Sequence, residues 1–204
     1  MGGECTLVPM DLKQFDGIDQ LGGIIHERWG RLDGLFANAG VLGDITLAPH
    51  VEPKVFDEVF AVNMTANYRL IRSLDPLLRK SEAGRAVFLS SGVSISRRAY
   101  WSAYAASKAA LDSIAESMRA ELREKGVFIT QIHFPLVHTA MSAATEMFQK
   151  LPGMSSEQAA DWMVRAVCRR PAKIMDLKTK IAKWLYLLFP RTAEACSKKL
   201  PFSV

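Results

Sequence analysis

The sequence predicts a doubly wound α/β domain, in which helices cover both faces of a parallel sheet. Short and mainly apolar runs, such as GRAVFLSS at residues 84–91, alternate with longer amphipathic segments. Such runs are typical of parallel strands, which are buried on both faces. With 204 residues, of which 49% are hydrophobic and 23% charged, the chain is long enough for one domain with a sizeable core.

We expect strands and helices to alternate along most of the chain. The segment Ser102–Leu122 is rich in Ala and Leu and has neither Gly nor Pro, which favours a helix. A capping box, Ser155-x-x-Gln158, marks the start of the last domain helix. The predicted strands are residues 5–10, 34–38, 84–91 and 126–135. The predicted helices are residues 15–29, 53–78, 102–122 and 154–170.

Polar residues follow the predicted strands. In a doubly wound sheet, ligands bind beyond the carboxyl ends of the strands, so these residues are candidates for a site. Singly, each has a structural explanation: a serine can cap a helix, Asn-Ala-Gly can form a turn, and Pro-x-x-x-Thr can be a loop. At one edge of one sheet they need a common explanation. The candidates are Asp11, Asn38, Ala39, Gly40, Ser90, Ser91, Pro135 and Thr139.

A tyrosine and a lysine stand one helical turn apart in the segment SAYAASKAALDSIAESMRAEL. Tyr104 and Lys108 occupy positions i and i+4, whose Cβ atoms lie about 5–6 Å apart on one face of a helix. The phenol and the ammonium could therefore serve one site. The alternative is an aromatic ring that packs over a lysine stem, because the motif alone is common by chance.

Composition excludes several other classes of protein. Cys5, Cys168 and Cys196 are far apart and form no C-x-x-C, so we expect a reducing compartment, with neither a disulfide framework nor a metal site. The N-terminal residues do not form a signal peptide, and no uncharged apolar run of about 18 residues occurs. The expected location is the cytoplasm.

Several motifs in order resemble the short-chain dehydrogenase/reductase family. They are FANAG at residues 36–40, AVNM with Asn63, FLSSG with Ser91, Tyr104-Ala-Ala-Ser-Lys108 and the loop FPLVHT. Ser91 precedes Tyr104 by thirteen residues, the usual interval in the family. The resemblance extends over residues 4–170. It implies a Rossmann-like sheet and hydride transfer between NAD or NADP and a carbonyl or alcohol.

The resemblance also implies a role for each residue in the reaction. Tyr104 would deliver a proton to the developing alkoxide, and Lys108 would lower the pKa of this phenol from its usual value of about 10. Ser91 would hold the substrate oxygen. Asn63 would position a water that connects Lys108 to solvent. The alternative for Asn63 is a polar side chain that is satisfied within its helix.

Cofactor contacts are implied at the same edge of the sheet. The aspartate would accept from the adenine amino group, the Asn-Ala-Gly turn would line the adenine ribose, the lysine would bind the nicotinamide ribose, and the threonine would face the carboxamide. In front of that threonine, Pro135-Leu136 replaces the family's Pro-Gly. The implied cofactor residues are Asp11, Asn38, Ala39, Gly40, Tyr104, Lys108 and Thr139.

The family's G-x-x-x-G-x-G turn after the first strand does not occur in this sequence. Gly2-Gly3 precedes a predicted strand and Gly22-Gly23 lies inside a predicted helix, so neither replaces it. We therefore expect that the first two strand–helix units, roughly 50 residues, are missing. The choice between NAD and NADP is then unreadable. In a compact structure, residues 5–10 should pair directly with residues 34–38, because an empty slot would leave backbone groups unpaired.

The second half, from FPLVHTAM to RRPAKI, resembles bacterial fatty acyl-CoA reductase-like members of the family. This implies a lipophilic substrate such as a fatty aldehyde or an acyl-CoA. The family's helix interface, here residues 53–78 and 101–124, implies a homodimer or homotetramer. Because the glycine-rich turn is absent, the alternative is a non-catalytic fragment or a scaffold that dimerises through these helices.

The C-terminal end is strongly basic. We expect residues 1–174 to form the partial α/β domain and residues 175–204 to form a basic amphipathic extension. From residue 165 onwards, ten Lys/Arg stand against two Asp/Glu. Packing of an apolar stripe on the domain or over the substrate cleft is the commoner use of such a helix. The alternative is an interfacial helix on an anionic membrane. No nucleic-acid partner is expected, because no recognised motif accompanies the charge. The stripe consists of Ile181, Trp184, Leu185 and Leu188.

Overall fold

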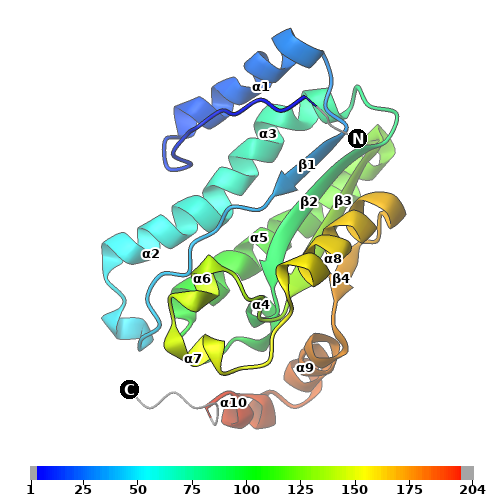
Figure 1. Ribbon diagram of the computed structural model, residues 1–204. Coiled ribbons are helices and arrows are strands. Elements are labelled where there is room, and N and C mark those ends of the chain that lie inside the picture. The colour runs from blue at the N-terminus through cyan, green and yellow to red at the C-terminus, as the bar shows by residue number, and fades with distance from the viewer. Residues whose placement is uncertain (1–3, 199–204) are drawn as a thin grey trace.

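The computed structural model describes residues 4–198 and has a four-stranded parallel sheet at its centre (Figure 1). Each strand pairs with the next one along the chain, and the register sets Phe36 opposite Val87 and Val87 opposite Thr130. All carboxyl ends therefore lie at one edge, as the predicted α/β fold requires. The strands are β1 (Gly34–Ala37), β2 (Gly84–Ser91), β3 (Val127–Phe134) and β4 (Lys173–Met175).

Helices cover both faces of this sheet. The helices α3 (Ala66–Leu78) and α5 (Ser102–Leu122) pack on one face, and α8 (Ser156–Arg169) packs on the other. Helix α1 (Phe15–Trp29) lies on α3 (Figure 1). The remaining helices are α2 (Pro53–Phe60), α4 (Val93–Ser96), α6 (Ala140–Ala143), α7 (Glu146–Gln149), α9 (Leu177–Leu188) and α10 (Pro190–Lys198), with 3₁₀ turns at Ala48–His50 and Arg123–Lys125.

Two apolar cores lie on the two faces of the central strands. Successive strand residues point to opposite faces, so Phe88 packs with Leu111 of α5, whereas Val87 packs with Ala166 of α8. Ile132 of β3 belongs to the second core. Strands β2 and β3 are buried on both faces, as is typical of parallel strands, and β3 also buries the polar residues Thr130, Gln131 and His133.

Gly22 sets the distance between α1 and α3. A Cβ atom at this position would lie 2.4 Å from the carbonyl oxygen of Ser73, and the Gly22 N–H donates to the Ser73 hydroxyl at 3.1 Å. Asp19 and Arg69 join the same two helices through an ion pair of 2.6 Å. The predicted helix at residues 15–29 is therefore confirmed, and its glycine allows the close approach.

Two other local signals of the sequence also form structure. The predicted helix at residues 53–78 consists of α2 and α3 joined by a π-helical turn, Ala61–Thr65. Turns of this kind occur frequently at functional sites. The predicted capping box begins α8: the Ser155 hydroxyl accepts from the Gln158 N–H at 3.3 Å, and the Gln158 side chain accepts from the Ser155 N–H at 3.0 Å.

The predicted strand at residues 5–10 and its pairing with β1 are wrong. The segment has no regular secondary structure, and among the described residues β1 pairs only with β2. Instead, the segment runs along α1 in the opposite direction, with Glu4 paired to Arg28 and Met10 against Gly17 (Figure 1). A short turn connects the segment to α1, and α1 is fixed on α3. The segment therefore stays beside the helix and does not reach the edge of the sheet.

The C-terminal tail forms the two helices α9 and α10, and its predicted apolar stripe does not pack on the domain. Ile181, Trp184 and Leu188 are 58%, 59% and 61% exposed, and only Leu185 of the predicted stripe is partly covered. The packing interpretation is therefore wrong for this stripe. No helix among residues 4–198 is long and apolar enough to cross a membrane.

We expect Gly22→Ala to destabilise the protein, although alanine favours helices. The added methyl group would overlap the Ser73 carbonyl, and the resulting displacement should lower the free energy of unfolding by about 1–3 kcal/mol. Gly23→Ala is the matched control because no atom lies within 4 Å of its Cβ position. The free energy of unfolding of Gly23→Ala should be higher than that of the unaltered protein by about 0.5–1 kcal/mol. Urea unfolding measures both, and equal stabilities would contradict the close packing of α1 on α3.

Candidate active site

Helix α5 carries Tyr104 and Lys108 to the carboxyl edge of the sheet. Lys108 is only 4% exposed, and its Nζ donates a hydrogen bond to the Leu89 carbonyl oxygen at 2.8 Å. The same nitrogen lies 5.9 Å from the centre of the Tyr104 ring. The i, i+4 spacing therefore places the phenol and the ammonium side by side.

Burial changes the pKa values of both groups. It lowers the pKa of Lys108 to about 8, and the charge of Asp112 offsets part of this effect. Burial raises the pKa of the Tyr104 phenol, and a hydrogen bond with Ser91 opposes this. The protein alone thus does not give the lowered Tyr104 pKa expected from the sequence, because desolvation is the larger effect.

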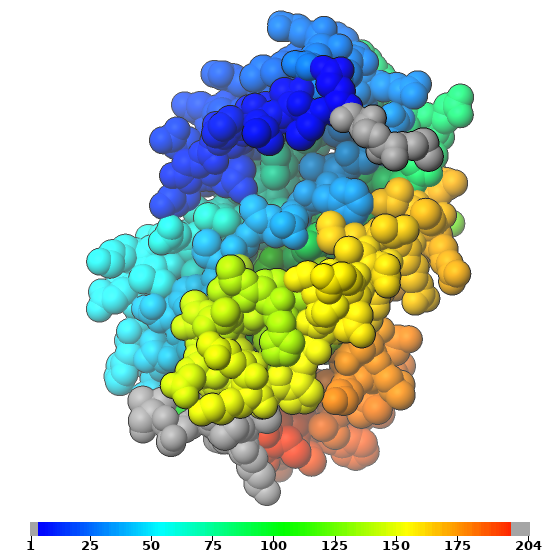
Figure 2. Space-filling view, viewed as in Figure 1, coloured from blue at the N-terminus to red at the C-terminus, as the bar shows by residue number. Residues whose placement is uncertain are grey.

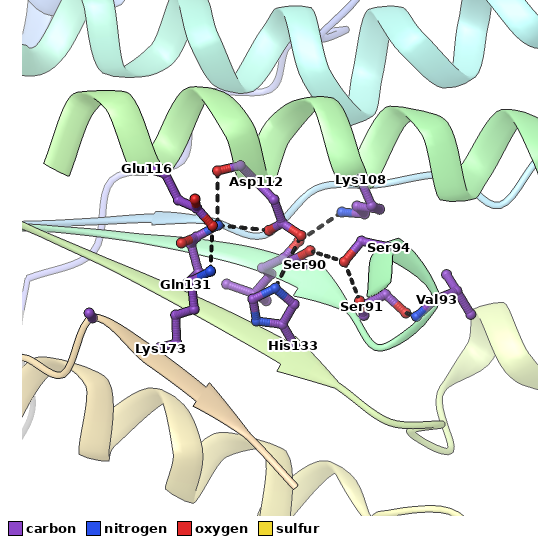
Figure 3. A network of polar contacts seen from close by, with 12 residues as sticks. Ser90, Ser91, Val93, Ser94, Lys108, Asp112, Glu116, Gln131, His133 and Lys173 are labelled. Carbon is purple, nitrogen blue, oxygen red and sulfur yellow. Dashed lines mark hydrogen bonds and ion pairs between the residues drawn. The ribbon is translucent and has the colours of Figure 1, made fainter. Parts of the chain in front are cut away.

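Ser91 and Ser90 end β2 and have different surroundings. The Ser91 side chain lies close enough to Tyr104 to lower the pKa of the phenol. The Ser94 hydroxyl donates to the Ser91 carbonyl at 2.7 Å, which fixes the turn after the strand. Ser90 is buried, and its hydroxyl lies beside the hydroxyl of Ser94 and the carboxylate of Asp112 (Figure 3). Of the two serines, Ser91 is the one positioned beside the phenol.

Asn63 is fully buried in the π-helical turn, and its side-chain amide makes hydrogen bonds with other residues of the protein. Oδ1 accepts from the Val41 N–H at 2.8 Å, while Nδ2 donates to the Val41 carbonyl at 2.9 Å and to Ser107 Oγ at 3.0 Å. Ser107 in turn donates to the Tyr104 carbonyl at 2.8 Å. The Asn63 side chain is thus satisfied by partners outside its own helix, and it ties the turn after β1 to the start of α5. Its role toward a water stays a prediction.

The turn Asn38-Ala39-Gly40 after β1 lies against this cluster. A Cβ atom at Gly40 would be 3.2 Å from Asn63 Oδ1 and 3.4 Å from Lys108 Nζ. Asn38 is exposed, and its N–H donates to the Phe36 carbonyl at 3.0 Å. The main chain can approach the lysine here because glycine has no side chain.

The loop after β3 ends at Thr139, the exposed N-cap of α6. Backbone hydrogen bonds hold this loop: the Met154 N–H donates to the Leu136 carbonyl at 2.8 Å, and the His138 N–H donates to the Met154 carbonyl at 2.9 Å. The loop is thus fixed without the family's glycine after Pro135.

Asp11 lies elsewhere, in the turn before α1. Its carboxylate accepts from the Lys13 N–H at 2.9 Å, and Lys13 pairs with Glu58 of α2 at 3.0 Å. These contacts do not join it to the cluster around Lys108. The implied contact of Asp11 with adenine therefore stays a prediction.

A second buried polar cluster, which the sequence pattern did not indicate, lies next to Lys108 along α5 (Figure 3). Asp112, one turn after Lys108, lies 3.1 Å from His133 Nε2 and accepts from Gln131 Nε2 at 2.9 Å. Burial alone would raise the pKa of Asp112, but hydrogen bonds from His133 and two serines together hold it below its usual value. The carboxylate is therefore an anion near a buried ammonium. The spacing Lys-x-x-x-Asp was the available signal.

Apolar side chains surround Tyr104. The ring of Trp101 lies 6.1 Å from that of Tyr104 and 5.4 Å from that of Phe148 in α7. A depression of about 460 Å³, lined by residues 42–46, His50 and Thr145, adjoins this cluster. Another, of about 370 Å³ between α1 and α3, contains none of the candidate residues. The buried members of the cluster are Val93, Trp101, Ala105 and Phe148.

A parallel sheet with a serine and a buried Tyr–Lys pair at its carboxyl edge defines a Rossmann-like α/β protein whose site is suited to proton transfer. The chain belongs to the short-chain dehydrogenase family, because the family model described as short chain dehydrogenase matches residues 1–150. The resemblance drawn from its motifs is thereby confirmed.

Two curated relatives are named fatty acyl-CoA reductase. The protein of Acinetobacter baylyi is 35% identical over 193 residues, which are 93% of this chain and 64% of that protein. The protein of Mycobacterium tuberculosis is 32% identical over 200 residues, which are 97% of this chain and 68% of that protein. The chain thus spans about two thirds of the length of these relatives.

Solved structures of short chain dehydrogenases have the same fold. One from Salmonella enterica serovar Typhi superposes with a TM-score of 0.75 at 31% identity, over 82% of this chain and 72% of that one. One from Escherichia coli, complexed with NADPH, has a TM-score of 0.72 at 33% identity, over 80% of this chain and 71% of that one.

The buried ammonium should make stability depend on pH. The pKa of Lys108 is about 8 in the folded protein and 10.5 in an exposed lysine, so between these values the unfolded chain binds more protons. Stability should therefore rise with pH in this range, by about 2–3 kcal/mol from pH 7 to pH 10.

The measurement is the difference in unfolding free energy between the protein and Lys108→Met, from urea titrations at pH 7 and pH 10. From pH 7 to pH 10, the unfolding free energy of the protein should rise relative to that of Lys108→Met. Lys125→Met, which changes an exposed lysine, is the control. Its difference in unfolding free energy from the unaltered protein should be the same at pH 7 and pH 10. A constant difference for Lys108→Met as well would mean that the ammonium is not buried in solution.

Proposed function

We propose that this chain is part of an NAD(P)-dependent oxidoreductase that interconverts a carbonyl and an alcohol on a lipophilic substrate. One observation carries the proposal: Ser91, Tyr104 and Lys108 meet at one strand end, where Ser91 lowers the pKa of the phenol and a buried ammonium lies 5.9 Å from the centre of its ring. The fatty acyl-CoA reductases among the relatives support an acyl chain or a fatty aldehyde as the substrate.

Tyr104 is the proton donor in this proposal. Burial raises its pKa, so the phenol is neutral at pH 7 and has a proton to give to an alkoxide. Ser91, whose side chain lies near the same phenol, can donate to the substrate oxygen as negative charge develops there. The ammonium of Lys108 then stabilises the phenolate that remains after proton transfer.

A dinucleotide fits the edge that these residues form. When bound, it supplies or accepts the hydride. Gly40 keeps the space next to Lys108 Nζ free of a side chain, so a ribose could approach both. We propose that the turn Asn38-Ala39-Gly40 lines the adenine ribose, Lys108 binds the nicotinamide ribose, Thr139 faces the carboxamide and Asp11 accepts from adenine. Neighbours from Shigella flexneri and Escherichia coli are complexed with NADP and NADPH.

The apolar cluster around Tyr104 supports a lipophilic substrate. A hydrocarbon chain that lies against Leu42, Ile45 and Leu136, which are partly exposed members of the cluster, would bury apolar surface, which contributes about 25 cal/mol per Å². Asp44 and His50 line the neighbouring depression. A small polar substrate would gain nothing from these contacts.

We further propose that copies of the protein associate through α2, α3 and α5, the helices of the family's interface. Phe56 and Tyr68 on these helices are 41% and 43% exposed, and Phe56 stacks on Phe60 at 4.6 Å. A reducing compartment fits the three cysteines, all of which are exposed free thiols.

A non-catalytic scaffold remains the second candidate, because the family's glycine-rich turn does not occur in these residues. A titration with NADPH, followed by fluorescence, separates the two candidates. We expect this chain to bind NADPH weakly or not at all, and an N-terminally extended version with the glycine-rich turn to bind it tightly. If neither this chain nor the extended version binds NADPH, the result would favour the non-catalytic scaffold.

We expect Tyr104→Phe to lower turnover at least about 10²-fold, because proton transfer by a positioned side chain contributes 10²–10⁴-fold. The assay follows NADPH or NADH oxidation by the extended protein with a panel of aldehydes, ketones and acyl-CoAs. Tyr68→Phe is the matched control, since Tyr68 is exposed on α3, and it should keep full activity. Undiminished turnover in Tyr104→Phe would refute the proposed role.

A further inference from the structure

The outward face of α9 is apolar. Leu177, Ile181, Trp184 and Leu188 are 70%, 58%, 59% and 61% exposed. They recur at spacings of four, three and four residues, which place them on one stripe of the helix. Leu187 and Phe189, 64% and 59% exposed, widen the stripe at its C-terminal end. We call these six residues the α9 face. A contiguous group of large apolar side chains marks an interaction site more often than it is tolerated on a monomer.

The inward face of α9 fixes this orientation. Thr179 is only 8% exposed, and a Cβ atom at Gly92 would lie 3.0 Å from its hydroxyl oxygen. Thr179 lies about 160° around the helix from Leu177 and Ile181, because each residue advances the helix by about 100°. The helix therefore turns a small polar residue toward the protein and its largest apolar residues toward solvent. This is the reverse of a helix that covers a core.

Lysines border the α9 face on both sides. Lys178 lies on one side of the stripe, and Lys180 and Lys183 lie on the other, all of them exposed. No Asp or Glu occurs from Leu177 to Ala193. Long lysine side chains can cover apolar surface with their stems and still present the ammonium at the rim. The result is an apolar stripe bordered by positive charge.

The α9 face lies close to the candidate active site. Gly92, which contacts Thr179, directly follows Ser91, and α4 packs against α9. In Figure 2, the orange α9 and the yellow α6–α7 segment occupy the same end of the molecule. Helix α9 therefore lies between the α9 face and the end of β2 that carries Ser91.

We propose that the α9 face binds the surface of a membrane that contains anionic lipids, with the helix lying in the plane of the headgroups. The apolar stripe would enter the boundary between headgroups and acyl chains, and the flanking lysines would contact lipid phosphates. Delivery of an acyl substrate from the membrane to Tyr104 is the consequence, and that step alone depends on the function proposed above.

A second copy of the chain fits the α9 face less well. Two such stripes packed together would bring the lysines of both copies to one rim, without an acidic residue on the helix to balance them. An anionic lipid surface meets both features, because it accepts the apolar stripe and neutralises the rim.

The test is co-sedimentation of the full 204-residue chain with vesicles of phosphatidylcholine, with and without about one third phosphatidylserine. We expect binding to the anionic vesicles that weakens as salt is added. Replacement of Lys178, Lys180 and Lys183 by alanine should lower the partition coefficient about a hundredfold. The matched control replaces the exposed residues Lys54, Lys125 and Lys150 and should change binding little, although it removes the same charge.

The apolar half of the proposal has its own pair of variants. Trp184→Glu should lower the partition coefficient about tenfold or more, whereas Val164→Glu, which changes an equally exposed residue on α8, should not. Equal losses in both variants, or no pelleting of the unaltered chain, would overturn the proposal. So would a lipid-free dimer that Trp184→Glu dissociates in sedimentation velocity, since a second copy would then cover the α9 face. None of these readouts depends on enzyme activity, so the two proposals can fail separately.

Discussion

The burial of one ammonium group organises the site. A cation removed from water is strongly unfavourable unless polar groups surround it, and the pKa of Lys108, lowered to about 8, shows that part of this penalty remains. The Leu89 carbonyl accepts a hydrogen bond from its Nζ, and Asp112 supplies the opposite charge. Asn63 holds the turn that passes over it. These groups together supply the polar surroundings that the buried ammonium of Lys108 needs.

The same helix joins Tyr104 and Lys108 to the sheet through a polar stripe. Lys108 and Asp112 follow Tyr104 at intervals of four residues, beside the apolar residues of α5 that enter the core. Gln131 and His133 are two residues apart on β3, so both point to the face that meets Asp112. Figure 3 shows the stripe continuing to Glu116, which pairs with Lys173 of β4. The position of Tyr104 is thus tied to three strands, and a shift of α5 would break hydrogen bonds as well as apolar contacts.

The sequence was sufficient to predict those features whose stabilising contacts are between residues close together along the chain. The extent of α5 follows from its composition, the start of α8 follows from Ser155 and Gln158, and the edge that carries the site follows from the alternation of strands and helices. The contact between Asp112 and His133 joins residues 21 positions apart, on a helix and a strand. Predicting it requires knowing which faces meet, and spacing alone does not give this.

Two predictions are wrong because each assumed a packing partner that the segment does not meet in the structure. Residues 5–10 have the composition of a strand, but a strand exists only with a hydrogen-bonded neighbour, and these residues lie along α1 instead.

The tail was expected to pack through its apolar stripe because that is the usual arrangement. Here the Asp176 carboxylate accepts from the Thr179 N–H at 2.9 Å and begins α9 at a fixed rotation. Thr179 lies against Gly92, where a Cβ atom on the glycine would be 3.0 Å from the threonine hydroxyl oxygen. The helical repeat then directs Leu177, Ile181 and Trp184 outward. A cap and a glycine contact thus determine the exposed surface, although the hydrophobic pattern alone favours the opposite orientation.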